Sequence, residues 1–158
     1  LLPDDVIAAE KPCLQQMVET YESKGGNVIA VMEVPEEHTH RYGIVSPGET
    51  DGAVTEVRGF VEKPKQGTAP SRLAAVGRYV IQPEVFALLG EGARGAGGEI
   101  QLTDALARMI GTKPFHAQTF EGVRHDCGDK AGFIQANIAL ALERPDLEPA
   151  IRAFLKTL

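Results

Sequence analysis

The stretch NVIAVMEV, residues 27–34, decides the fold class of this chain. It is a continuous apolar run of strand length, rich in β-branched residues, and it directly follows the pair Gly25-Gly26. A strand of this kind is typical of a sheet covered on both faces, because a half-exposed strand alternates apolar and polar residues. The run therefore predicts a central strand in an α/β domain.

Helix and strand patterns alternate on both sides of this run. Upstream, residues 12–24 carry Leu14, Met17, Val18 and Tyr21 at the spacing of one helix face, which predicts an amphipathic helix. Downstream we expect strands over 41–45, 54–64, 73–81 and 114–120, and helices from Pro83, from a cap at Thr103 or Asp104, and over 131–144 and 147–158. This order favours an α/β fold with a Rossmann-like, mixed and mainly parallel sheet.

Turn residues divide these elements. Residues 46–53 are dense in them, so we expect a hairpin loop there and an antiparallel insertion around 41–64. Residues 121–130 read as a polar turn, and the opening LLPDD resembles the end of a buried strand that runs into a turn. Five glycines in 90–98 predict a flexible loop more than a phosphate cradle, because the segment follows a helix and lacks GxxxxGK[ST].

The composition excludes several classes of protein. With 16 Lys and Arg against 22 Asp and Glu, the net charge is −6, which argues against a nucleic-acid partner because duplex binding needs a basic face. No window approaches the roughly 18 apolar residues of a membrane span, and residues 1–158 contain no signal-peptide pattern. We therefore expect a globular, cytoplasmic protein with no membrane partner.

The cysteines and histidines give no metal-ligand spacing. Cys13 and Cys127 lie far apart in the sequence, and in a chain with this much core we expect reduced thiols more than a disulfide. His38 and His40 are separated by one residue. An exposed loop is the expectation for this pair, with a metal site as the alternative.

Three polar clusters follow predicted strands, and they are Asp4-Asp5, Glu62-Lys63-Pro64 and Asp126 with Gly128. Taken singly, each has an ordinary structural explanation as a helix cap, an exposed pair before a proline, or an Asx turn. Taken together they suggest a site, because ligands of open α/β sheets bind where strands end at their carboxyl edge.

The chemistry of these clusters fits a sugar phosphate and a metal ion. Carboxylates from two strand ends can hold one Mg²⁺, which binds through one or two carboxylates plus substrate phosphates. Lys63 is a compact cation suited to phosphate, and Glu62 offers two acceptor oxygens to neighbouring hydroxyls of a sugar. Gly43 and Gly77 would let the backbone approach a flat ligand closely.

Four motifs in this order, FVEKP, AVGRYV, GEIQLTDAL and DCGDKAGF, resemble the bacterial UTP–glucose-1-phosphate uridylyltransferases, a family of sugar-nucleotide pyrophosphorylases. The resemblance covers nearly the whole chain, and GEIQLTDA with DCGDK points to the uridylyl branch more than to the thymidylyl branch. It implies a sheet of the nucleotide-diphospho-sugar transferase type. It also implies the cofactor Mg²⁺, the substrates UTP and glucose 1-phosphate, the product UDP-glucose, and a homo-oligomer.

The resemblance also assigns roles to matching residues. Asp4 and Asp126 would bind Mg²⁺, and whether Asp4 or its neighbour Asp5 reaches the metal stays open. Lys63 would bind the phosphate of glucose 1-phosphate and is the candidate catalytic residue, and Glu62 would bind the glucose hydroxyls. The remaining candidates for the substrate site are Tyr42, Gly43 and Gly77, the two glycines through their backbone.

One family feature is missing from this sequence. The family begins with a strand and a glycine-rich loop of the kind GxGTR, which the resemblance implies should precede residue 1. We therefore expect residues 1–158 to be the C-terminal portion of a single nucleotidyltransferase domain, with C-terminal helices over 131–158, that is poorly stable and inactive alone. The alternatives are a thymidylyltransferase of the same superfamily and a non-catalytic sugar-phosphate-binding module.

Overall fold

The computed structural model describes the backbone of residues 1–158 and every side chain except that of Ala96. The chain forms two compact units. The first contains Leu1 and Cys13–Phe120, and the second contains Leu2–Pro12 and Glu121–Leu158. Both units mix helices and strands, so the predicted α/β content is confirmed.

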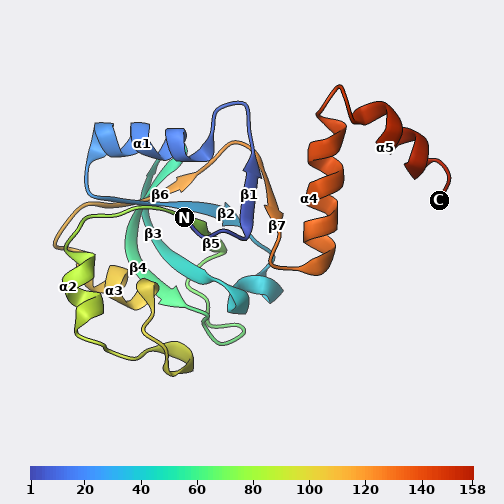
Figure 1. The fold of residues 1–158 in the computed structure, drawn as a ribbon. Helices are drawn as coiled ribbons and strands as arrows, with labels where there is room; N and C mark the ends of the chain where they lie inside the picture. The colour runs from blue at the N-terminus through green and yellow to red at the C-terminus, as the bar shows by residue number, and fades with distance from the viewer. The chain divides into compact units, whose positions relative to one another are not determined.

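The strands of the first unit form a closed barrel (Figure 1). Its order is β2 (Asn27–Glu33), β5 (Leu73–Val80), β3 (Gly43–Asp51), β4 (Val54–Glu62) and β6 (Phe115–Thr119). Within the described chain only β2 and β6 pair in parallel. The sheet is mixed, as predicted, but the prediction that it is mainly parallel is wrong. Alternation of helix and strand patterns does not say which strands are neighbours, and here β5 pairs antiparallel with β2 and β6 pairs antiparallel with β4. The antiparallel hairpin expected around 41–64 is confirmed as β3 and β4, which a tight turn joins.

The central strand of the prediction is confirmed as β2. Val28, Ile29, Ala30 and Val31 have no exposed surface, so both faces of this strand are covered, as the continuous apolar run indicated. The hairpin after it is longer than predicted, because β3 continues to Asp51 and only residues 52 and 53 connect it to β4. The register shifts on both sides of Pro47, and such irregularities let a strand accommodate a proline without an amide hydrogen.

Helices cover the barrel on two sides (Figure 1). They are α1 (Cys13–Lys24), α2 (Val85–Gly90) and α3 (Leu102–Met109), with short 3₁₀ turns at Glu36–Arg41 and Ala96–Gly98. The core includes Val85 of α2, Leu106 and Met109 of α3, and Phe60 of β4, whose ring meets Phe115 edge to face. This packing fixes α3 against the strand that ends at Glu62.

Two details of these helices differ from the prediction. In α1 the buried face consists of Cys13, Met17 and Thr20, whereas Leu14, Val18 and Tyr21 of the predicted face are 37–39% exposed. Thr20 can face inward because its hydroxyl donates a hydrogen bond to Gln118 Oε1, at 2.5 Å. In α3 the N-cap residue is Gln101, so neither Thr103 nor Asp104 is the cap.

The second unit is built on a two-stranded antiparallel sheet (Figure 1). Strand β1 (Asp5–Ala8) pairs with β7 (Val123–Asp126), and Asp5 lies opposite Asp126. LLPDD therefore leads into a strand, of which Asp5 is the first residue, instead of ending one. Residues 121–130 contain a strand that the turn prediction missed. The polar sequence of β7 hid it, because a strand paired on one edge of a small sheet needs no continuous apolar run.

Helices α4 (Lys130–Leu142) and α5 (Glu148–Leu155) follow β7. Asp129 caps α4, since its Oδ2 accepts a hydrogen bond from the Gly132 amide at 2.9 Å. The described residues of α5 include none that is buried. Among the residues described, no helix combines the length and the apolar character that crossing a bilayer requires.

Candidate functional site

Four of the five predicted substrate residues meet at one end of the β3–β4 pair, and they are Tyr42, Gly43, Glu62 and Lys63. Glu62 is the last residue of β4 and lies opposite Gly43, the first residue of β3. Lys63 then leaves the strand with φ of +43°, and its amide donates a hydrogen bond to the Tyr42 carbonyl at 3.0 Å. A non-glycine residue with positive φ is uncommon and costs conformational energy, and such residues cluster at functional sites. The Glu62–Lys63 junction is thus a tight turn of the backbone that a hydrogen bond stabilises, and we call it, with Tyr42 and Gly43, the corner.

The Glu62 carboxylate is fixed inside this corner. Its side chain is 12% exposed, and its Oε2 accepts a hydrogen bond from the Thr103 hydroxyl at 2.6 Å. Its Oε1 lies 3.7 Å from Nζ of Lys63, whose side chain is 56% exposed. The corner therefore joins a sheltered carboxylate to a solvent-accessible ammonium, which together can bind hydroxyl and phosphate groups.

The two predicted glycines occupy crowded or strained backbone positions. A Cβ at Gly43 would lie 2.9 Å from Cε2 of Phe60 and 3.1 Å from Oε2 of Glu62. Gly77 is buried and has φ of +64°, within a register shift between β5 and β2. Gly77 belongs to β5, which contacts β3 through the pair Ala74 and Ile44. Gly77 therefore lies on the strand that neighbours β3, whereas Tyr42, Gly43, Glu62 and Lys63 lie at the corner itself.

The predicted metal ligands come together in the second unit. Asp126 ends β7, and the Cys127 amide donates a hydrogen bond to the Asp4 carbonyl at 2.7 Å. A Cβ at Gly128 would lie 3.1 Å from Oδ2 of Asp4 and 3.3 Å from Oδ1 of Asp126. Two carboxylate oxygens therefore face one small space, which glycine keeps open, and this donor set fits a hard cation such as Mg²⁺.

No group of three or more His, Cys, Asp or Glu able to hold a metal occurs among the described residues. A cation beside Gly128 would therefore take its other ligands from water or from a phosphate, as Mg²⁺ commonly does. His38 and His40 are exposed on either side of the buried Thr39, as expected, but they lie in the 3₁₀ turn Glu36–Arg41 and not in a loop. Cys13 and Cys127 are free thiols, as predicted.

Asp5 has a different environment from Asp4. Its side chain is 6% exposed, and its Oδ1 accepts a hydrogen bond from Nε of Arg124. Burial raises the pKa of the Asp5 carboxyl, and the guanidinium of Arg124 opposes that shift. Asp4 is exposed. The structure thus separates the two neighbouring aspartates into one held by Arg124 and one that reaches the space beside Gly128.

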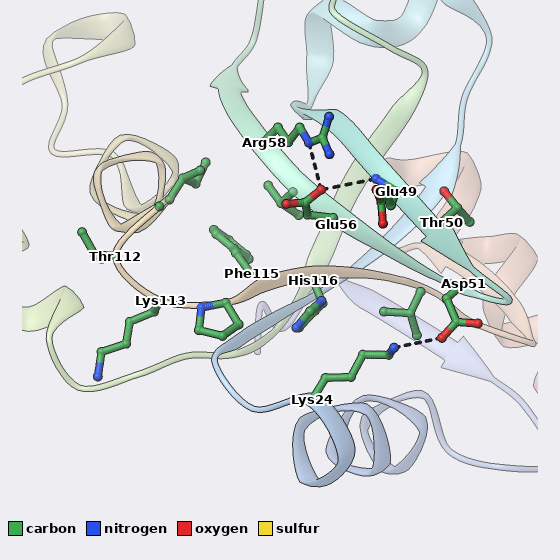
Figure 2. A pocket seen from close by; sticks show the side chains of 15 residues that line it. Lys24, Glu49, Thr50, Asp51, Glu56, Arg58, Thr112, Lys113, Phe115 and His116 are labelled. Carbon is green, nitrogen blue, oxygen red and sulfur yellow. Dashed lines mark hydrogen bonds and ion pairs between the residues drawn. The ribbon is translucent and has the colours of Figure 1, made fainter.

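The first unit also contains a pocket of about 850 Å³ at the far end of the β3–β4 hairpin (Figure 2). Its walls are the end of α1, the hairpin, and residues 110–116. Its lysines and arginine already have carboxylate partners: Lys24 pairs with Asp51 and Arg58 with Glu56 (Figure 2), and Lys113 pairs with Glu84. None of the predicted substrate residues lines this pocket among the residues described. The pocket therefore lies outside the candidate substrate site.

Two residues that contact candidate site residues, Thr103 and Arg124, were not predicted from the sequence. Thr103 was one of two candidate helix caps, with Asp104 as the alternative, and its hydrogen bond to Glu62 spans 41 positions of sequence. Arg124 belonged to a segment interpreted as a turn, yet its guanidinium contacts both Asp5 and Asp126. Arg124 and Asp126 share a face because they stand at i and i+2 of β7, but this spacing is no signal in a segment that the sequence does not mark as a strand.

Comparison with known proteins gives a consistent picture. The family model of the nucleotidyl transferases matches residues 1–143. The UTP–glucose-1-phosphate uridylyltransferase of Staphylococcus epidermidis is 49% identical over 158 residues, which are 100% of this chain and 55% of that protein. The chain thus spans about half the length of the curated relatives it matches.

Solved structures agree with these relatives. The structure of a UDP-glucose pyrophosphorylase complexed with UDP-glucose has a TM-score of 0.84 and 36% identity, over 90% of this chain and 55% of that one. The UTP-bound enzyme from Acinetobacter baumannii has a TM-score of 0.86 and 34% identity, over 100% of this chain and 55% of that one.

Proposed function

Because this chain belongs to the nucleotidyl transferase family, we propose that the protein forms UDP-glucose and pyrophosphate from UTP and glucose 1-phosphate. The observation that carries the proposal is the 49% identity, over the whole chain, to a UTP–glucose-1-phosphate uridylyltransferase. The corner at Glu62 and Lys63 supports it, since a carboxylate beside an ammonium suits a sugar that bears a phosphate. The names of the relatives favour a uridylyl over a thymidylyl substrate.

Each residue of the substrate site has one role in this proposal. Lys63 binds the phosphate of glucose 1-phosphate and neutralises its charge, which makes it the catalytic residue. Glu62 accepts hydrogen bonds from glucose hydroxyls. The backbone of Gly43 and Gly77 lies against the sugar, and Tyr42 stabilises the corner because its carbonyl accepts a hydrogen bond from the Lys63 amide.

Asp4 and Asp126 are the residues that would hold Mg²⁺, supported by the two oxygens that face the space beside Gly128. Mg²⁺ bound there would supply charge neutralisation for substrate phosphates. We propose Asp4 over Asp5 as the ligand, because the carboxylate of Asp5 is engaged with Arg124.

The proposed reaction needs no general base. A phosphate oxygen of glucose 1-phosphate is ionised at neutral pH, and it attacks the α-phosphorus of UTP. A new P–O bond forms while the bond from the α-phosphorus to the bridging oxygen breaks, and pyrophosphate leaves with that electron pair. The protein contributes positioning and charge neutralisation. The four histidines and two cysteines of the chain have no assigned role in these steps.

The test is an assay of the protein in its natural length with UTP, glucose 1-phosphate and Mg²⁺, in which UDP-glucose and pyrophosphate are quantified. We expect Lys63→Ala and chelation by EDTA each to remove most of the activity. A preference for dTTP over UTP would support the thymidylyltransferase alternative. Binding of glucose 1-phosphate without turnover of any nucleotide would support the non-catalytic module.

We further propose a homo-oligomer in the cytoplasm. Large apolar side chains near the C-terminus support an assembly, because Phe154 is 59% exposed and Leu158 is 89% exposed, and exposed apolar groups of this size favour association. Light scattering coupled to size-exclusion chromatography measures the mass of the assembly. A monomer at micromolar concentration would contradict this part of the proposal.

A further inference from the structure

The hydroxyl of Thr103 donates a hydrogen bond to a residue of the candidate sugar site. Thr103 is 6% exposed, and its Oγ1 donates to Oε2 of Glu62 at 2.6 Å. A hydrogen bond of this length is typical of a hydroxyl bound to a carboxylate, which is a charge-assisted and comparatively strong interaction. Its two partners come from α3 and from the end of β4, so the bond connects a helix to the corner.

The position of this hydroxyl is set by the core of the first unit. Thr103 lies in the first turn of α3, and Ala105, Leu106 and Met109 of the same helix are buried. A β-branched side chain in a helix has few rotamers available. The hydroxyl is therefore anchored by helix packing, and it holds a glutamate whose own long side chain would otherwise sample many rotamers.

The surroundings of Glu62 leave its carboxylate few alternative positions. Oε2 accepts the hydrogen bond from the Thr103 hydroxyl. It also lies beside the backbone of Gly43, since a Cβ on that residue would lie 3.1 Å from it. Oε1 lies on the side of Lys63, at 3.7 Å from its Nζ. A carboxylate has about four lone-pair sites. With Thr103 occupying one of them, the orientation of the rest is fixed before a ligand arrives.

We propose that Thr103 is a positioning residue for sugar recognition, which presets the Glu62 carboxylate to accept hydrogen bonds from neighbouring hydroxyls of the sugar. This inference rests on the proposed function, in which Glu62 binds the glucose moiety. It assigns Thr103 no contact with the reacting phosphates, so its removal affects binding of the sugar and leaves binding of the nucleotide unchanged.

The experiment uses the natural-length protein and the variants Thr103→Val, Thr103→Ser and Thr20→Val. Valine keeps the shape of threonine without the hydroxyl, and serine keeps the hydroxyl. Thr20 is the matched control because it is also 6% exposed and also donates to a side-chain oxygen, that of Gln118. Calorimetry measures binding of UDP-glucose and of UTP separately, and kinetics measure KM for glucose 1-phosphate and kcat.

We expect Thr103→Val to weaken UDP-glucose binding and raise KM for glucose 1-phosphate by about tenfold, because a hydrogen bond to a charged group is lost. UTP binding and kcat should stay within about twofold. Thr103→Ser should restore most of the loss, and Thr20→Val should bind both ligands like the wild type. In a Glu62→Ala background, Thr103→Val should have no further effect on binding.

Each other outcome has a defined meaning. If the wild type forms UDP-glucose and Thr103→Val matches it, the positioning role is overturned while the proposed function stands. Equal losses in Thr103→Val and Thr20→Val, or an undiminished loss in the Glu62→Ala background, would overturn it as well. If the wild type neither forms nor binds UDP-glucose, the proposed function fails first and this inference falls with it.

Discussion

Nη2 of Arg124 lies 3.3 Å from Oδ2 of Asp126 on the same strand. Nε of the same guanidinium donates to Oδ1 of Asp5 on the neighbouring strand. The guanidinium is 12% exposed and Asp5 is 6% exposed, so one sheltered cation serves two carboxylates. This arrangement connects the stability of the β1–β7 pair to the orientation of a candidate metal ligand.

Loss of that cation should destabilise the second unit. We expect Arg124→Met to lower the free energy of unfolding by about 3 kcal/mol, because it leaves the buried Asp5 without its charged partner. Arg152→Met is the control, since it breaks an exposed pair with Glu148 and should cost less than about 0.5 kcal/mol. Urea denaturation measures both. Equal stability of Arg124→Met and wild type would contradict the structural role of Arg124.

Gly43 should be needed for the geometry of the corner. We expect Gly43→Ala to weaken UDP-glucose binding by about tenfold or more. The Cβ of the alanine would lie 2.9 Å from the Phe60 ring and 3.1 Å from the Glu62 carboxylate. Gly90→Ala is the matched control, since a Cβ there meets nothing within 4 Å. Calorimetric titration compares the two variants, and tight binding by Gly43→Ala would show that the corner tolerates a side chain.

How far the sequence predicts these sites depends on the range of the interactions. The pair Glu62 and Lys63 is adjacent in the chain, and the burial of β2 follows from one apolar run, so both could be predicted. Strand β7 and the partner of Thr103 could not, because neighbours of a strand and long-range hydrogen bonds leave no local pattern. The same limit explains why a mainly parallel sheet was expected where antiparallel pairs dominate.

The adjacent glycines at the end of α1 provide a comparison of two similar substitutions. Both have positive φ, at +70° for Gly25 and +73° for Gly26. A Cβ at Gly25 meets nothing within 4 Å, whereas one at Gly26 would overlap the carbonyl of Pro114. We expect Gly25→Ala to cost about 1 kcal/mol from backbone strain alone. Gly26→Ala should cost at least about 3 kcal/mol, because the backbone must also move. Thermal and urea unfolding distinguish these costs, and similar losses in both variants would place Pro114 elsewhere.

His116 should make the stability of the first unit depend on pH. Burial lowers the pKa of this imidazole from its usual 6.5, Lys24 lowers it further, and Glu56 opposes the shift. Near pH 6.5, His116 of the unfolded chain is therefore protonated to a greater extent than His116 of the folded chain. The stabilisation is present above about 6.5 and is lost as the pH falls through the lower folded pKa.

The variant His116→Asn isolates this contribution, because asparagine cannot titrate but can still donate to the Lys24 carbonyl that the imidazole binds. We expect the free energy of unfolding of the wild type to fall more steeply than that of His116→Asn as the pH drops below about 6.5. The exposed His40 supplies the control variant His40→Asn, which retains His116 and so should keep the steeper dependence. Parallel curves for wild type and His116→Asn would show that the folded structure does not suppress protonation of this histidine.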